Sequence, residues 1–600
     1  MLKDCLEIFD KYKGSDDSVI LDSYILAEGD YIVVKKDGSL DHCFIKFDKK
    51  TRTVENKPMN YDKLCFYDYY SSLVSMNKPI DNKKVIHSNN YLSFFVKQDN
   101  LHSGKLTEKV IENFYDTLAK PEGKYTKKSE KGMYKNVEEK LGKVDVEKLK
   151  SSKKWILNNI LNIGEENEIK SGSGRVVKLS GGKNYLKVFF EEDDDEYIKE
   201  GSRYFLMKMY NNNDYSVEIN KDIFGLPNDN MGLNSKKPFL EHKNQKNTVP
   251  YLITTNEALL QKKFFDYLMN QANLGKNIIY LDNSGELDSE DIIEAKKIGE
   301  EPENKFSGYM LVIKKGTEAG IIYQDMITFY RDKLKRKFRY KNLTGNVGLE
   351  EVVGTIDTKK ELQSVLNEIM FFKFLVGNYF TDVGEISLAG DIGKGNLKNY
   401  LVLSRDAIFN WLYKDNEYGM KKVVNNIFPL IVRESINKGY MNKAIQQFNL
   451  YLSLKEYFEG DEKMGIDYVT IEKELFKKID GKTKAIITSD EEYYYAIGQL
   501  VKYYITKNKT KDKKHSLANP FINAKDNTFL RERLLRAFKK YNYNLSFGDK
   551  RFNNLYGMIL VYNNAGKVNQ DAIVAGYLRE NIIYKKNEET SENNSTEEVK

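Results

Sequence analysis

The chain has 600 residues, of which 40% are hydrophobic and 30% charged, and its formal net charge is +7. No apolar run approaches the roughly 18 residues of a membrane-spanning helix, and no apolar signal core follows the first residues, which predicts a cytoplasmic protein without membrane contact. The three cysteines, Cys5, Cys43 and Cys65, have no CxxC spacing, so a disulfide framework or a zinc cluster is not expected.

The first half of the chain combines short strand-like runs with polar turns, which predicts α+β structure. We expect an N-terminal α+β region over 1–118 and a middle α+β region over 137–350. Between them, residues 119–136 are basic and poor in apolar side chains, which predicts a linker or loop. The acidic string at 191–196 is most simply a solvated turn. The runs with strand character are 31–34, 91–96, 185–190, 204–210 and 309–314.

From about residue 350, apolar residues recur at the 3.6-residue spacing of amphipathic helices. This pattern predicts a helical region over 351–488 and a helical bundle over 489–585. The last residues, 586–600, have no apolar cluster to bury and are expected to be disordered. The predicted fold class is α+β: mixed N-terminal and middle regions with strands, followed by a C-terminal α-helical bundle.

Motifs for catalysis are weak in this sequence. The strings "LSGGKN" (179–184) and "GDIGKGN" (390–396) lack the spacing of a phosphate-binding GxxxxGK[ST] loop, so both are better interpreted as turns. The histidines are scattered and form neither HExxH nor a His-Asp pair. We therefore expect no enzyme activity, no metal and no cofactor, although an active site built from residues far apart in the sequence would leave no such motif.

Basic residues concentrate in two stretches that also contain Tyr and Phe. One is "RDKLKRKFRYK" (331–341), and the other includes "RERLLRAFKKYNY" (531–543). A single basic helix face is more often simply solvated, but two clusters with interleaved aromatics favour a surface that follows a nucleic-acid backbone by charge. The predicted backbone-binding residues are Arg331, Lys335, Arg336, Lys337, Arg339, Arg531, Arg536, Lys539 and Lys540.

An amide- and lysine-rich loop, "NDNMGLNSKKPFLEHK" (228–243), divides two patterned regions. Asparagine amides can pair with a base edge or a ribose, and lysines can hold phosphates. The alternative is a loop whose side chains satisfy its own backbone, and chemistry alone ranks the two equally. The string "IHSNNYLSFFVK" (86–97) raises the same choice. The candidate residues are Asn228, Asn230, Asn234, Lys236, Lys237 and Lys243 in the loop, and His87, Asn89 and Asn90 in the N-terminal region.

Long blocks of the chain resemble a known family. They are "YDYYSSLVSMNKPIDNKKVIHSNNYLSFFVK" (67–97), "LPNDNMGLNSKKPFLEHK" (226–243), "YYYAIGQLVKYYI…HSLANPFINAK" (493–525), "RFNNLYGMILVY" (551–562) and "AIVAGYLREN" (572–581). In this order they are similar to the large subunit of the type I-B CRISPR interference complex (Cascade). The resemblance covers nearly the whole chain, and its blocks are far more specific than the short motifs above.

The resemblance implies a non-catalytic subunit that sits at the 5′ handle of the CRISPR RNA beside the other Cascade backbone subunits and the small subunit. Such a subunit recognises the protospacer-adjacent motif in duplex DNA, helps to start the R-loop, holds the displaced strand and recruits a helicase-nuclease. RNA–DNA pairing supplies the sequence specificity. The asparagine-rich loops would then read the motif, and the basic bundle would hold single-stranded DNA. The family also has an N-terminal α+β region and a C-terminal helical bundle.

One further feature is the string "EGDEKMG" (459–465) before the bundle. In several subtypes the small subunit resembles this bundle and is translated from an internal start, so Met464 is a candidate start; an ordinary acidic turn explains the string equally well. Two other functions compete with the leading hypothesis. A nuclease or nucleotidyl cyclase would need a His-Asp site or paired acids after Gly-Gly, and neither string occurs. An RNA-binding scaffold would never contact target DNA.

Overall fold

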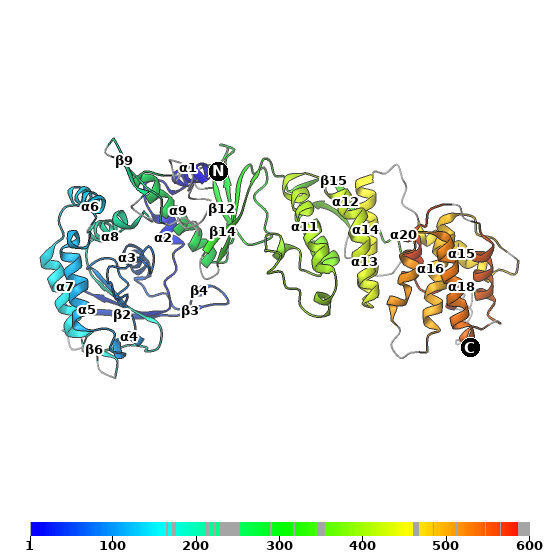
Figure 1. Ribbon diagram of the computed structural model, residues 1–600, viewed down its shortest axis with the longest axis horizontal. Coiled ribbons are helices and arrows are strands. Elements are labelled where there is room, and N and C mark those ends of the chain that lie inside the picture. The colour runs from blue at the N-terminus through cyan, green and yellow to red at the C-terminus, as the bar shows by residue number, and fades with distance from the viewer. Residues whose placement is uncertain are drawn as a thin grey trace, which may run out of the picture. The chain divides into compact units, whose positions relative to one another are not determined.

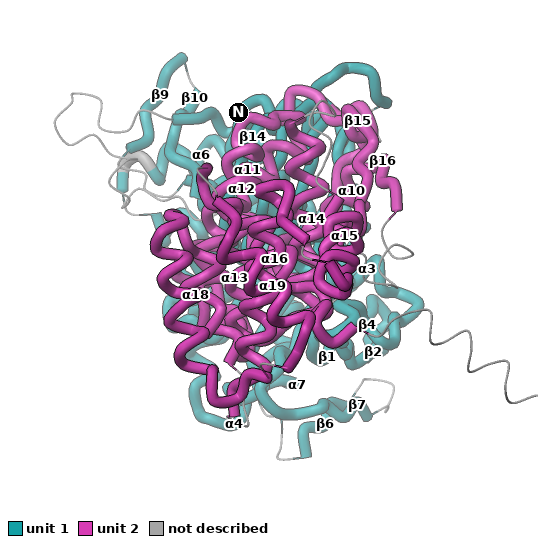
Figure 2. Tube along the Cα trace, turned by 90° about the vertical axis from the view of Figure 1, so that its right-hand side faces the viewer, with its two compact units in different colours: residues 1–298, 307–326 teal, residues 299–306, 327–600 magenta. Residues whose placement is uncertain are grey.

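The computed structural model describes most of the chain. Outside the described residues lie 1, 126, 162, 164–165, 171–175, 211–214, 221, 229–251, 289–290, 316–318, 345–353, 460–466, 484, 510–513, 547, 564–565 and 586–600. The rest forms two compact units, shown in different colours in Figure 2. Unit 1 comprises residues 1–298 and 307–326, and unit 2 comprises residues 299–306 and 327–600. The chain therefore passes between the units three times.

Unit 1 contains a sheet with the strand order β2-β1-β8-β5. Strand β1 (Gly29–Val34) is buried along its whole length, as its apolar run predicts for a central strand. It pairs in parallel with β8 (Tyr185–Phe190) and antiparallel with β2 (Leu40–Ile45), while β5 (Ser93–Lys97) pairs antiparallel with β8. Stacked rings, such as Tyr67 on Tyr197 with 4.1 Å between centroids, join the helices that pack on this sheet.

A second sheet of unit 1 has the order β12-β11-β13-β14. Its strand β11 (Ile278–Asp282) is fully buried and pairs antiparallel with β12 (Ile293–Lys296) and β13 (Gly308–Lys315). Helices α1 (Leu2–Lys13) and α9 (Thr255–Asn273) pack together beside it through rings such as Phe9 and Phe264. The remaining elements of unit 1 are α2 (Ser18–Asp22), β3 (Phe47–Asp48), β4 (Thr53–Val54), α3 (Tyr61–Ser71), α4 (Asp99–His102), α5 (Glu108–Ala119), η1 (Pro121–Lys124), α6 (Lys128–Leu141), α7 (Val146–Asn159), β6 (Glu168–Lys170), β7 (Val176–Lys178), α8 (Asp194–Lys208), β9 (Val217–Ile219), β10 (Asp222–Phe224) and β14 (Ala319–Ile327).

Unit 2 is mostly helical, and the first elements of its long segment 327–600 are the paired strands β15 (Lys333–Arg339) and β16 (Thr355–Thr358). A first group of helices follows, and then a bundle in which α16 lies beside α15, α18 and α20 (Figure 1). The elements after β16 are α10 (Lys359–Val365), the π-turn η4 (Leu366–Met370), η5 (Val376–Asn378), η6 (Asp391–Lys394), α11 (Leu397–Lys414), α12 (Met420–Asn426), α13 (Phe428–Asn437), α14 (Met441–Glu459), α15 (Tyr468–Asp480), α16 (Asp490–Thr506), η7 (His515–Ala518), α17 (Asn519–Ile522), α18 (Asn527–Tyr541), η8 (Asn542–Asn544), α19 (Lys550–Val561), α20 (Gln570–Leu578) and η9 (Ile582–Tyr584).

The close packing of α16 on α20 depends on glycine. A Cβ atom on Gly498 would lie 2.2 Å from the main-chain oxygen of Ile573, and one on Gly576 would lie 2.2 Å from that of Tyr495. Each helix therefore contributes a glycine where its backbone meets the other helix. Almost every side chain of α16 is buried as a result.

The predicted α+β fold class is confirmed, with strands in the N-terminal and middle regions and helices toward the C-terminus. Three local predictions need correction. Residues 204–210, expected as a strand, belong mostly to helix α8, and the acidic string at 191–196 leads into its first turn, where Asp and Glu stabilise the helix N-terminus. The expected linker 119–136 contains η1 and the start of α6.

Among the helices that the structure describes, none has both the length and the apolar character that crossing a bilayer requires.

Candidate nucleic-acid interface

The basic stretch 331–341 forms strand β15 and its flanks in unit 2. Leu334 and Phe338 are buried, whereas the five basic residues of the strand are exposed. The pairing with β16 changes register between Lys333 and Phe338. The apolar side chains thus hold the strand on unit 2 while its cations face solvent.

Three of the predicted backbone-binding residues at this strand already have partners. The Arg331 guanidinium lies 3.7 Å from the Asp415 carboxylate, and Lys335 donates to the main-chain oxygen of Asp415 at 2.8 Å. The Arg336 guanidinium lies over the ring of Tyr457, 4.6 Å from its centroid. These contacts position the cations without burying them.

Lys337 and Arg339 differ from the other cations of β15. Within the part of the chain that the structure describes, neither side chain has a hydrogen bond, an ion pair or a ring contact. Residues two apart on a strand point to the same side, so these two side chains start about 7 Å apart. Their spacing suits phosphates that follow one another along an extended nucleic-acid strand.

The guanidinium of Arg531, on the bundle helix α18, is hydrogen-bonded within the fold. Its guanidinium donates to the Tyr493 hydroxyl at 3.2 Å and to the main-chain oxygen of Tyr562. Its assignment as a backbone-binding residue does not fit this position, because the side chain ties α18 to α16 and to the end of α19.

The other predicted residues of α18 face solvent. Arg536 is 80% exposed and lies 3.7 Å from Glu532 one turn earlier. Lys539 and Lys540 are exposed near the end of the helix, where Lys540 lies over the ring of Tyr541. The end of α18 therefore carries three accessible cations.

The amides of the string 86–97 are buried and bonded within the fold. Asn89 Nδ2 donates to the main-chain oxygens of Tyr70 and Ser72 at 2.9 and 2.8 Å. Asn90 Nδ2 donates to the Asn89 side-chain oxygen at 2.8 Å. Both residues are 1% exposed. Here the alternative holds: these amides satisfy the chain's own backbone, and the prediction that they contact nucleic acid does not fit their burial.

His87 has the same kind of internal role. One ring nitrogen is 2.9 Å from the main-chain oxygen of Lys84, and the other is 2.7 Å from the Tyr185 hydroxyl. Burial lowers the pKa of this imidazole. Together with the two asparagines, His87 anchors the segment 72–92, which joins α3 to the strand β5.

The loop 228–243 begins beside helix α8. The Asn228 N–H donates to the main-chain oxygen of Met209 at 2.6 Å, and Pro227 forms a bridge with Tyr210. The other predicted residues of this loop lie outside the described part of the chain, as does the candidate start Met464. They are Asn230, Asn234, Lys236, Lys237 and Lys243. The first residue of the loop thus lies next to the end of α8.

At this same place in unit 1 lies a pocket of about 370 Å³ whose lining the sequence did not reveal. Its lysines come from positions far apart in the chain, and lysine is too common here for any one of them to stand out. Of the stretches that supply these lysines, the sequence marks only 119–136 as basic, and there it predicts a linker. The lysines that line the pocket are Lys78, Lys84, Lys124, Lys127 and Lys208.

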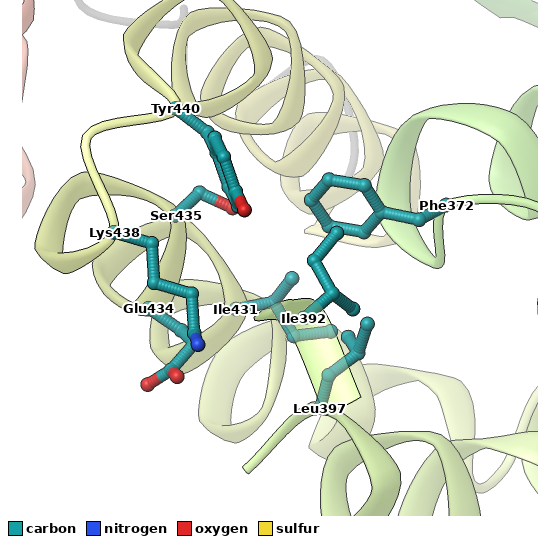
Figure 3. A pocket seen from close by; sticks show the side chains of 8 residues that line it. All are labelled: Phe372, Ile392, Leu397, Ile431, Glu434, Ser435, Lys438 and Tyr440. Carbon is teal, nitrogen blue, oxygen red and sulfur yellow. The ribbon is translucent and has the colours of Figure 1, made fainter. Parts of the chain in front are cut away.

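Two pockets of unit 2 have other characters. The crevice in Figure 3 lies between apolar side chains such as Phe372 and Leu397 and the charged groups of Glu434 and Lys438, and its volume of about 10 Å³ admits no more than a water molecule. A larger pocket of about 540 Å³ lies between α19 and the residues 485–487 and is mostly apolar. Neither resembles a site for a nucleic-acid strand.

Among the described residues, no group of three or more His, Cys, Asp or Glu side chains is placed to hold a metal ion. Comparison of the chain with protein-family models, with curated proteins and with solved structures finds no match.

Proposed function

We propose that this chain is a non-catalytic, nucleic-acid-binding large subunit of an RNA-guided surveillance complex of the type I-B CRISPR class, acting in the cytoplasm in antiviral defence. One observation carries the nucleic-acid part: the exposed cations of β15, of which the Lys337 and Arg339 side chains have no partner within the described residues. The resemblance of the long sequence blocks to the Cascade large subunit supports the class of complex.

The β15 surface supports a particular mode of binding. Side chains of lysine and arginine on an open strand contact phosphates and release counterions, which gives affinity without reading bases. The accessible cations at the end of α18, Arg536, Lys539 and Lys540, suit the same mode. We assign this mode to the displaced single strand, whose sequence differs from target to target.

The remaining roles follow from the resemblance. In this proposal the chain contacts the 5′ handle of the CRISPR RNA and the other Cascade subunits, including the small subunit. It recognises the adjacent motif in duplex DNA, helps to start the R-loop and recruits a helicase-nuclease that cuts in trans. The loop that begins at Asn228 is assigned to motif reading.

The first test measures the binding of the full-length protein to a single-stranded oligonucleotide by fluorescence anisotropy over a range of salt concentrations. The double variant Lys337→Gln/Arg339→Gln removes two phosphate contacts. The slope of log affinity against log salt should therefore become shallower by about 1.4, with a loss of roughly 25-fold in affinity near 0.1 M salt.

The matched control is Lys421→Gln/Lys473→Gln, which removes two exposed lysines of unit 2 from other helices. Its salt slope should equal that of the unmodified protein. Equal slopes for all three proteins would contradict the assignment of β15.

A second experiment addresses the complex. The protein assembled with Cascade backbone subunits and CRISPR RNA is offered duplexes that differ only in the adjacent motif. Higher affinity for one motif is expected, and equal affinity for all would reject motif recognition. Metal-dependent cleavage of DNA by the isolated chain would instead favour the nuclease alternative.

A further inference from the structure

The lysine-lined pocket of unit 1 brings three parts of the chain together. These are the segment 77–84 before β5, the stretch 124–130 that includes the start of α6, and the end of α8. Among the described residues that line the pocket, Glu130 is the one acid. The positive side chains are Lys78, Lys84, Lys124, Lys127 and Lys208. The pocket therefore has a strong excess of positive charge.

Two of these lysines also hold the wall of the pocket. Lys78 Nζ donates to the main-chain oxygen of Tyr210 at 2.6 Å. Lys124 Nζ donates to the main-chain oxygens of Pro79 and Ile80 at 3.0 and 2.7 Å. These bonds tie the three segments to one another, so the positive charges are held in place before any ligand arrives.

Lys84 and Lys208 have weaker contacts. Lys84 Nζ is 3.5 Å from the side-chain oxygen of Asn77, and the Lys208 ammonium lies over the ring of Tyr125, 5.6 Å from its centroid. An ammonium group has three donors. Both head groups therefore keep hydrogen-bond donors for a ligand.

The clustering of these charges has a cost for the fold. Burial, with the Lys208 charge adding to it, lowers the pKa of Lys78 and of Lys124 to about 8. Burial also lowers the pKa of Lys208. Charged groups that are desolvated beside like charges destabilise a protein unless an anion offsets them. The C-terminus of α8 carries a partial negative charge of only about half an elementary charge, which is too little to offset several lysines.

We propose that this pocket is a binding site for a phosphate group. Lysine head groups act as point charges and can surround a tetrahedral, multiply charged oxyanion. The pocket, at about 370 Å³, is many times larger than the roughly 30 Å³ of a water molecule, so a phosphate fits together with part of the molecule that carries it.

Two sources can supply this chemistry: a phosphate of a nucleic-acid chain, or a free phosphate compound. The start of the loop 228–243 beside the pocket, through the bond from Asn228 to Met209, makes the nucleic-acid source the natural one to test first. The proposal of a phosphate site does not depend on nucleic-acid binding at β15, because the site could equally bind a free phosphate compound.

The test is calorimetric titration of the full-length protein with inorganic pyrophosphate, together with competition between pyrophosphate and a single-stranded oligonucleotide. Lys84→Gln/Lys208→Gln should weaken pyrophosphate binding about tenfold or more, because two charges leave the site. Lys105→Gln, which removes an exposed lysine elsewhere in unit 1, is the matched control and should bind as the unmodified protein does.

The outcomes separate the two sources. If the oligonucleotide loses affinity in the double variant and competes with pyrophosphate, the ligand is a nucleic-acid phosphate. If only pyrophosphate binding changes, the ligand is a free phosphate compound. Equal pyrophosphate binding by the variant and by the unmodified protein overturns the proposal. The β15 variant should bind pyrophosphate normally, so failure here and failure of the proposed function are distinguishable.

Glu130→Gln provides a change in the opposite direction. Removing the one negative group that lines the pocket should tighten pyrophosphate binding by several-fold, about fivefold for one charge at contact distance in water. A variant that merely misfolds cannot bind more tightly. No gain in affinity would count against the site.

The pocket should also respond to pH, and sulfate is the suitable probe because its own charge is constant over this range. As pH rises from 7 to 9, Lys78 and Lys124 lose their protons near pH 8, so the affinity for sulfate should fall. The other charged groups that face the site are Lys84, Lys127, Lys208 and Glu130, with Asp81 near Lys124. Burial lowers the pKa of Lys208 as well, so its loss of charge acts in the same direction. An affinity that is constant across the range would contradict the roles given to Lys78 and Lys124.

Discussion

Asn89 lies between two main-chain carbonyl groups of unit 1, and its amide nitrogen donates to both of them. The residue is buried, so water cannot replace these bonds if the side chain is removed. Through them the end of α3 is joined to the segment that precedes β5.

We expect Asn89→Ala to lower the free energy of unfolding of unit 1 by about 1–3 kcal/mol, because the buried carbonyl of Tyr70 and the partly buried carbonyl of Ser72 lose a donor. The two tryptophans allow this to be measured: with Trp411 replaced by Phe, the fluorescence of Trp155 reports on unit 1 alone. Denaturant titration of this background with and without the Asn89 change gives the difference.

The matched control is Asn113→Ala on the exposed face of α5, where no side-chain bond is lost and stability should change by less than about 0.5 kcal/mol. Below its unfolding transition, Asn89→Ala should bind single-stranded DNA as the unmodified protein does. Unchanged stability with weakened DNA binding would instead restore the reading of Asn89 as a nucleic-acid contact.

The two roles of asparagine cannot be separated from sequence alone. An amide-rich string shows donors and acceptors, but not whether unpaired carbonyls of another element lie within reach. For 86–97 those carbonyls come from the end of α3, so tertiary structure decides the role. The pocket was hidden for a related reason, because Lys84 and Lys208 are neighbours only after folding.

At the scale of elements, the packing of α16 on α20 shows how a residue that is poor for a helix can be required by one. Glycine costs an isolated helix roughly 0.5–1 kcal/mol relative to alanine. At Gly498 and Gly576, however, an added methyl group would overlap main-chain atoms of the opposite helix. Main-chain atoms cannot move aside as a flexible side chain can, so the helices would have to separate.

We therefore expect Gly498→Ala and Gly576→Ala each to destabilise the bundle by about 1–3 kcal/mol, the usual cost of overpacking. Gly557→Ala is the matched control: this glycine lies within α19, and a Cβ atom there would meet no atom within 4 Å. It should stabilise by up to about 1 kcal/mol, as helix propensity predicts. Thermal unfolding followed by helical circular dichroism measures all three, and a stabilising effect of Gly498→Ala would contradict the close helix contact.

Some elements can be predicted from the sequence and others cannot. The bundle helices 490–506 and 527–541 were predictable because apolar residues repeat at helical spacing over several turns. Residues 204–210 were misread because Tyr, Phe and Met in a short run suit a buried strand as well as a buried helix. Nothing within 204–210 distinguishes a strand from a helix. The signal for a helix lies earlier, in the acidic first turn at 194–196.

At the scale of the whole molecule, the two units are interleaved along the chain. Residues 299–306 belong to unit 2, where Gln363 Nε2 donates to the main-chain oxygen of Gly299 at 2.8 Å. The hairpin β13–β14 then returns to unit 1 and supplies β13 as a partner of β11. Unit 1 is therefore incomplete in any fragment that ends before this hairpin.

We predict that a fragment of residues 1–298 aggregates or unfolds at lower temperature than a fragment of residues 1–328. The shorter fragment leaves an edge of β11 unpaired, and open apolar edges of this kind associate with other chains. Size-exclusion chromatography and thermal unfolding of the two fragments provide the comparison. Replacing 299–306 in the longer fragment by a flexible linker should change little, and equal stability of the 1–298 fragment would contradict the role of the hairpin.

The interleaving also sets an order of events on the ribosome. Domains usually fold as they emerge, the N-terminal one first. Unit 1 cannot close its second sheet until residues 299–326 have been added, although eight of those residues belong to unit 2. At about 5–20 residues per second this adds a delay of roughly 1–6 s, during which β11 is exposed in a nearly finished unit. The newly made chain is therefore most prone to misfolding and association while residues 299–326 are being added.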